Sequence, residues 1–133
     1  MLSHRADLRM RVDGLTLAEL FQSAFDGVMH VLKEKKPPQE IAKISKHRIK
    51  ISSADESALL IDFLNEVLYS AYSRKEIYLS AVFQKLSDTE LVAEIFGVPV
   101  KDFDEDIKAA TYHEVQIKRN ESGKLATVLV FDI

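Results

Sequence analysis

The stretch LATVLVFDI, residues 125–133, decides the fold because it is apolar on both faces of a strand. A strand with one face in water would alternate apolar and polar residues. This run therefore predicts a central strand that is covered on both sides. Asp132 interrupts it, on the same face as Val128 and Val130, and so stands at the end of an otherwise apolar face.

A hairpin is predicted to lead into this strand. HEVQIKR, residues 113–119, and LATVLVFDI flank the polar segment NESG, whose Gly123 can adopt the positive φ angle of a tight turn. A second hairpin is predicted upstream, across SDTE, because apolar residues alternate over 77–83 and again over 91–95. The second of these two segments is also compatible with a helix.

Two segments have the 3.6-residue period of helices with one buried face. The first follows a capping box formed by Thr16 and Glu19 and ends before Pro37. The second follows a capping box formed by Ser53 and Glu56 and is expected to end at about residue 73. Their apolar stripes are Leu17, Leu20, Phe21, Ala24, Val28, Val31 and Leu32, and Leu59, Leu60, Phe63, Leu64, Val67, Leu68 and Ala71.

A strand is also predicted at the start of the chain, where residues 7–12 alternate charged and apolar side chains. The predicted order of elements is thus β-α-β-α-β-β-β-β. Two one-sided helices must lie on an apolar surface. We therefore expect one α+β domain over residues 1–133, with two layers and both helices on one face of a mixed sheet.

Composition restricts the classes of function. The chain has no cysteine, which excludes disulfides, thiolate metal sites and a cysteine nucleophile and fits a cytoplasmic location. No apolar run reaches the length of a membrane span, so we expect no membrane partner. The net charge of −3, with both signs interspersed, argues against general electrostatic binding to nucleic acid.

One basic concentration stands out and consists of Lys43, Lys46, His47, Arg48 and Lys50. Isoleucines alternate with these residues, which favours the solvated face of a strand. A nucleic-acid patch is the alternative. The segment lacks the interleaved aromatic side chains that are typical of surfaces binding single strands.

Two carboxylates far apart in sequence are the best candidates for a site. Asp7 and Asp132 each lie near the end of a predicted strand, and they converge if the first and last strands are neighbours. Two like charges brought together need a cation, a shared proton or water. With oxygens of Ile133, the set would suit Ca²⁺ or Mg²⁺. The alternative is that Asp7 pairs with Arg9 or Arg11 and Asp132 is only the polar end of a strand.

Other polar side chains form weaker patterns. His4 and His113 have no partner at metal-ligand spacing, so isolated hydrogen-bonded histidines are the better interpretation. Asp62, Asn65 and Glu66 line up beside the apolar stripe of the second helix, as a solvated acidic face or as a docking face. A further polar group precedes the closing hairpin and comprises Lys108, Thr111, Tyr112 and His113.

Four motifs in this order carry a resemblance to a known family. They are His4-Arg5-Ala6-Asp7, LLIDFLNEVLY at 59–69, Lys108-Ala109-Ala110-Thr111-Tyr112-His113, and Phe131-Asp132-Ile133. In these motifs the chain resembles the archease family from end to end. It departs from the family pattern at Arg5, where a threonine is more usual, and at Asp106, where a glutamate is common.

The resemblance implies a protein that is not itself a catalyst. Archeases activate the RtcB-type RNA ligase of tRNA splicing and RNA repair, promoting guanylylation of the ligase and its repeated turnover. The resemblance implies a Ca²⁺ site at Asp7, Asp132 and Ile133, with RNA contacted only through the ligase. We expect the surface that acts on the ligase to include Asp7, Lys108, His113 and Asp132.

Two other functions remain open from the residues alone. One is a carboxylate-metal hydrolase that uses Asp7 and Asp132 around Mg²⁺, although no general base with an activated partner is evident. The other is an RNA-binding adaptor that uses the basic strand at residues 43–50.

Overall fold

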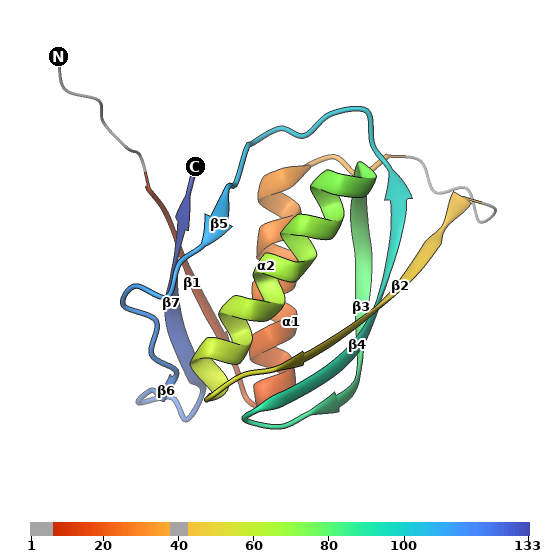
Figure 1. Ribbon diagram of the computed structural model, residues 1–133. Coiled ribbons are helices and arrows are strands. Elements are labelled where there is room, and N and C mark those ends of the chain that lie inside the picture. The colour runs from red at the N-terminus through yellow and green to blue at the C-terminus, as the bar shows by residue number, and fades with distance from the viewer. Residues whose placement is uncertain (1–6, 38–42) are drawn as a thin grey trace, which may run out of the picture.

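The computed structural model in Figure 1 describes residues 7–37 and 43–133 and confirms the α+β class. None of its helices is long and apolar enough to cross a membrane. The elements in chain order are β1 (Asp7–Gly14), α1 (Leu17–Leu32), β2 (Ser45–Ser52), α2 (Glu56–Arg74), β3 (Glu76–Leu86), β4 (Glu90–Pro99), β5 (Ala109–Ala110), β6 (Lys118–Arg119) and β7 (Leu125–Asp132).

The strands form two antiparallel sheets, where the sequence predicted one mixed sheet. In the first sheet the order is β1-β7-β5, and β6 also pairs with β7. In the second sheet the order is β2-β4-β3. β7 and β4 are thus the central strands, and every observed pairing is antiparallel. The central position predicted for residues 125–133 is confirmed for β7.

The helices lie between the two sheets rather than together on one face. α1 contacts β1 of the first sheet and β3 of the second, whereas α2 contacts β5 and β2 (Figure 1). Each helix therefore covers one of the two gaps between sheet edges.

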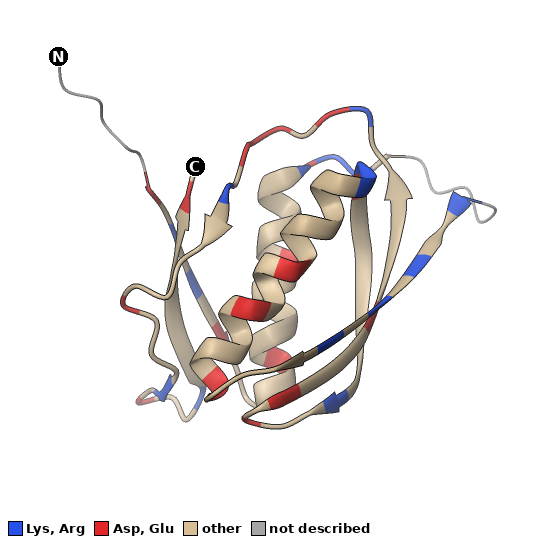
Figure 2. Ribbon diagram, viewed as in Figure 1, with Lys and Arg blue, Asp and Glu red and all other residues tan. Residues whose placement is uncertain are grey.

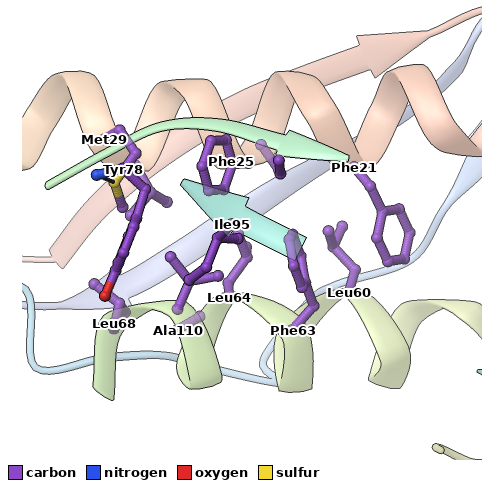
Figure 3. Packing of buried hydrophobic residues seen from close by; sticks show 14 of the residues in the cluster. Phe21, Phe25, Met29, Leu60, Phe63, Leu64, Leu68, Tyr78, Ile95 and Ala110 are labelled. Atoms are coloured by element: carbon purple, nitrogen blue, oxygen red, sulfur yellow. Dashed lines mark hydrogen bonds between the residues drawn. The ribbon is translucent and has the colours of Figure 1, made fainter. Parts of the chain in front are cut away.

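An aromatic cluster lies in the core where α1, α2 and β3 meet. The ring centroid of Phe63 in α2 lies 6.0 Å from that of Phe21, 6.3 Å from that of Phe25 and 5.4 Å from that of Phe83. Figure 3 shows Phe21 and Phe25 of α1 and Phe63 of α2 pointing toward one another. The predicted apolar stripes of both helices thus meet in a single core.

The predicted start is correct for α1 and wrong for α2. Thr16 Oγ1 accepts a hydrogen bond from Glu19 N, and the Glu19 carboxylate accepts one from Leu15 N at 2.7 Å. In α2 the cap is Asp55, which accepts a hydrogen bond from the amide three residues later. The hydroxyl of Ser53 instead donates a hydrogen bond to the Asp62 carboxylate, and its amide donates one to the carbonyl of Thr89 in the β3–β4 turn.

Both predicted hairpins are confirmed, and one is shorter on one side than expected. β3 pairs with β4 across residues 87–89, and Gly123 has a φ of 80° in the turn before β7. Only two residues of the 113–119 segment form a strand. The amides of Gln116 and Ile117 instead bond to the hydroxyls of Thr127 and Ser57, so this arm is held by side chains.

Replacing Phe63 with alanine should lower the free energy of unfolding by about 3–5 kcal/mol, because it removes the ring shared by both helices and β3. Urea unfolding followed by circular dichroism measures this loss. The control is Val82→Ala, since Val82 is 51% exposed and its truncation should change stability by less than about 0.5 kcal/mol. Equal losses in the two variants would contradict the central role of Phe63.

Candidate functional site

The pairing of β1 with β7 brings the two candidate carboxylates together. Asp7 is the register partner of Asp132, at the end of the first sheet. Directly opposite residues of an antiparallel pair project from the same face, with Cβ atoms about 4.5–5.5 Å apart. The convergence expected from the sequence is thus what the strand register produces, and Figure 2 shows the acidic ends of β1 and β7 side by side.

A third segment completes this end of the sheet. Ala109 in β5 is the register partner of Asp132 on its other side, and the amide of Lys108 donates to the Asp132 carbonyl at 2.8 Å. The amide of Thr111 donates to the Val130 carbonyl at 2.9 Å. The motif containing Lys108 is therefore fixed beside the acidic pair by backbone hydrogen bonds.

Asn65 of α2 fastens β5 to the helix. Its side-chain amide donates to the Ala110 carbonyl at 3.0 Å, and its side-chain carbonyl accepts from the Ala110 amide at 2.7 Å. The side chain thus bonds to β5 much as a neighbouring strand would. The sequence singled out Asn65 as part of a docking face, and the structure shows it bonded within the chain.

Asp62, one turn earlier, has a similar internal role. Its carboxylate accepts hydrogen bonds from the hydroxyls of Ser53 and Tyr112. Hydrogen bonding to Asp62 and partial burial raise the pKa of Tyr112. Of the three residues predicted to form a docking face, only Glu66 is exposed. The docking role of this face remains a prediction.

The segment after β5 turns back over the outer face of the first sheet. Glu114 has a positive φ of 62°, and its carboxylate accepts a hydrogen bond from the Arg9 guanidinium at 2.9 Å. This hydrogen bond and ion pair lower the pKa of Glu114. His113 Nε2 lies 3.5 Å from Glu114 Oε1. His113 is exposed beside an ion pair that the sequence did not predict.

Arg9 is therefore not the partner of Asp7. Within residues 7–37 and 43–133, the structure shows no ion pair that involves the side chain of Asp7 or Asp132. The alternative in which Asp7 pairs with Arg9 does not occur. Two carboxylates on one face thus lack a protein cation among the described residues, and like charges directly opposite in a sheet are destabilising.

The donor chemistry of this end fits a hard cation in part. Carboxylate and backbone oxygens are the ligands that Ca²⁺ prefers. Among the described residues, no three His, Cys, Asp or Glu side chains cluster closely enough to hold a metal ion. Within residues 7–37 and 43–133, ligands beyond the two carboxylates would be main-chain oxygens, such as that of Ile133, or water. His4 lies outside the described residues.

The basic strand predicted at residues 43–50 is largely solvated, as expected. Lys46, Arg48 and Lys50 are exposed on β2. His47 points the other way, and its Nε2 lies 2.7 Å from Oε1 of Glu76 in β3, the other outer strand of the same sheet. The interpretation of this segment as a solvated strand face is confirmed for the exposed residues.

Two features at this end of the protein were not predicted from the sequence. β5 is only two residues long, so it has no alternation to detect, and its pairing depends on Asn65, far away in sequence. The Arg9–Glu114 pair joins residues separated by nearly the whole chain. The Leu-rich helix motif containing Asn65 was the one available signal, because it marked a polar residue beside an apolar stripe.

The sequence of the chain matches the model of one protein family. The model of the Archease protein family matches residues 1–133. The chain belongs to the archease family. The resemblance carried by the four motifs is thereby confirmed over the whole chain.

Curated archeases match over nearly their full length. The archease of Pyrococcus furiosus is 30% identical over 144 residues, covering 98% of this chain and 94% of the relative. The archease of Methanosarcina barkeri is 26% identical over 137 residues, covering 97% and 92%.

Solved structures share the fold. The crystal structure of a Thermotoga maritima archease, described as a possible chaperone, superposes with a TM-score of 0.68 at 17% identity, covering 100% of this chain and 95% of that one. The solution structure of a Methanobacterium thermoautotrophicum protein gives a TM-score of 0.69 at 22% identity, covering 99% and 96%.

Replacing Asn65 with alanine should detach β5 from α2, because it leaves the Ala110 amide and carbonyl without these partners. We expect a loss of about 1–3 kcal/mol in unfolding free energy and faster hydrogen exchange at the Ala110 amide. Glu66→Ala, the exposed next residue, is the control and should change neither. Unchanged exchange at Ala110 in the Asn65 variant would contradict this assignment.

Proposed function

We propose that this archease is a non-catalytic activator of an RtcB-type RNA ligase, which promotes ligase guanylylation and repeated turnover. Membership of the family supports the proposal, and the pairing of Asp7 with Asp132 is the observation that carries it. The register of β1 and β7 creates a compact acidic end with Lys108 held beside it. We expect the protein to act in the cytoplasm.

We further propose that this acidic end binds a divalent cation, with Ca²⁺ first and Mg²⁺ second. Asp7 and Asp132 would hold it through their carboxylates and Ile133 through its main-chain oxygen. A bound cation would supply positive charge that offsets the repulsion between the two carboxylates. Lys108 and His113 would complete the surface that meets the ligase.

An activator of this kind changes the populations of ligase conformations. It can do so only by binding one conformation more tightly than the other, with about 1.4 kcal/mol for each factor of ten in the population ratio. A small acidic end suits a ligase cleft whose nucleotide and RNA contacts are basic. RNA would then be contacted only through the ligase, in keeping with the net charge of −3 of the whole chain.

Calcium should stabilise the wild-type protein and not the variants Asp7→Asn and Asp132→Asn. In the absence of metal each variant should unfold at the same temperature as the wild type or higher, because one of two repelling charges is gone. Thermal unfolding with and without Ca²⁺ measures both effects, and Asp88→Asn in the β3–β4 turn is the matched control. Equal stabilisation of all four proteins by Ca²⁺ would exclude this site.

Multiple-turnover ligation tests the activator role. With limiting ligase, the wild-type protein should raise the number of turnovers per ligase, and folded Asp7→Ala and Asp132→Ala proteins should lose most of this stimulation. Asp88→Ala should stimulate normally. Full stimulation by both acidic-end variants would refute the proposal.

A reaction without ligase separates the remaining alternatives. Processing of RNA by this protein and a metal ion alone would favour the carboxylate-metal hydrolase. Tight binding of RNA that weakens steeply with salt would favour the RNA-binding adaptor.

A further inference from the structure

A hollow of about 560 Å³ lies between α2 and the segment that carries β5, and we call it the α2–β5 groove. Tyr69, Tyr72 and Leu68 of α2 line it on one side, and Lys108 and Ala109 line it on the other. Ala109 is the register partner of Asp132, so the groove adjoins the acidic end of the first sheet.

Tyr69 is the most unusual side chain in the groove. It is 69% exposed, although the residues on either side of it in α2, Leu68 and Ser70, are buried. No hydrogen bond or ring contact with the described residues involves the side chain of Tyr69. By contrast, the hydroxyl of Tyr72 accepts a hydrogen bond from the Ile107 amide, and its ring packs on Phe103. Contacts within the fold therefore explain the position of the Tyr72 side chain but not the exposure of the Tyr69 side chain.

Several carboxylates lie near the groove, whose charged lining residue is Lys108. Glu66 is exposed and precedes Tyr69 by three residues, so the two side chains share one face of α2. Burial raises the pKa of Tyr72, and the nearby negative charges of Asp106 and Glu105 raise it further. These carboxylates, together with Asp132 next to Ala109, outnumber the ammonium of Lys108. The groove thus combines an exposed ring with a set of nearby carboxylates, which we call its negative rim.

This combination selects a particular kind of occupant. A guanidinium group stacks on an aromatic face and pairs with carboxylates at the same time, which an ammonium does less well. Tyrosine and arginine are also the side chains that most often dominate protein–protein interfaces. A nucleobase could stack on Tyr69 as well, but its phosphates would meet the negative rim.

We propose that the α2–β5 groove binds an arginine side chain of the partner ligase, with the guanidinium over the ring of Tyr69 and paired with Glu66. This inference rests on the proposed function for the identity of the partner. It adds a second contact with the ligase, outside the acidic end. This contact would hold the ligase while Asp7 and Asp132 face the ligase cleft. Tyr69 and Glu66 would then set affinity, whereas the acidic pair would set activation.

Titration calorimetry of the full-length protein with the ligase tests the contact. Tyr69→Ala should weaken binding by about tenfold, and Tyr69→Leu should weaken it nearly as much because an aliphatic side chain lacks the charge distribution of a ring. Tyr69→Phe should bind within about twofold of wild type, since the ring remains. Glu66→Gln should weaken binding and make it less dependent on salt.

The controls separate this contact from a loss of structure. Tyr69 is mostly exposed, so its variants should unfold at the wild-type temperature. Leu15→Ala removes another exposed apolar side chain, 59% exposed, away from the groove and should leave binding unchanged. At saturating concentrations, Tyr69→Ala should still stimulate ligation fully.

Four outcomes would overturn the inference, and they are distinguishable. Wild-type affinity in Tyr69→Ala would show that the groove is not a contact. Wild-type affinity in Tyr69→Leu would show an apolar rather than a cationic occupant. Weaker binding of an RNA oligonucleotide by Tyr69→Ala, with ligase affinity unchanged, would assign the groove to nucleic acid. Failure of the wild-type protein to bind the ligase would refute the proposed function together with this contact.

Discussion

The antiparallel pairing of β1 with β7 is the interaction on which the rest of the structure depends. It joins the first and last described strands over eight register pairs, from Asp7–Asp132 to Gly14–Leu125. It makes β7 a central strand, which pairs with β1, β5 and β6. The same register places two carboxylates opposite each other, so one set of backbone hydrogen bonds builds both the sheet and its acidic end.

The second helix, α2, connects this sheet to α1 and to the second sheet. Its inner face supplies Phe63 to the aromatic core, and Asp62 and Asn65 hold the segment around β5. Its exposed side carries Glu66 and Tyr69, whose side chains form no hydrogen bond or ion pair with residues 7–37 and 43–133. One helix therefore serves the core, the positioning of Lys108 and the surface proposed to meet the ligase.

The sequence predicted the features that depend on local periodicity. The helices, both hairpins and the central strand follow from apolar spacing, and Asp7 and Asp132 followed from their positions at strand ends. The division into two sheets was not predictable, because the strand pattern shows which residues face inward and not which strands pair. β5 and the Arg9–Glu114 pair were missed because each depends on contacts between residues distant in sequence. The exposure of Tyr69 was hidden within a helix motif that is otherwise apolar.

The pairing that forms the acidic end affects the order in which the protein folds. Asp7 and Asp132 lie in the first and last described strands, so their pairing joins residues far apart in the sequence. Closing so long a loop is entropically costly and is favoured only when the intervening helices and strands are already in place. A chain that lacks β1 or β7 thus cannot assemble this end.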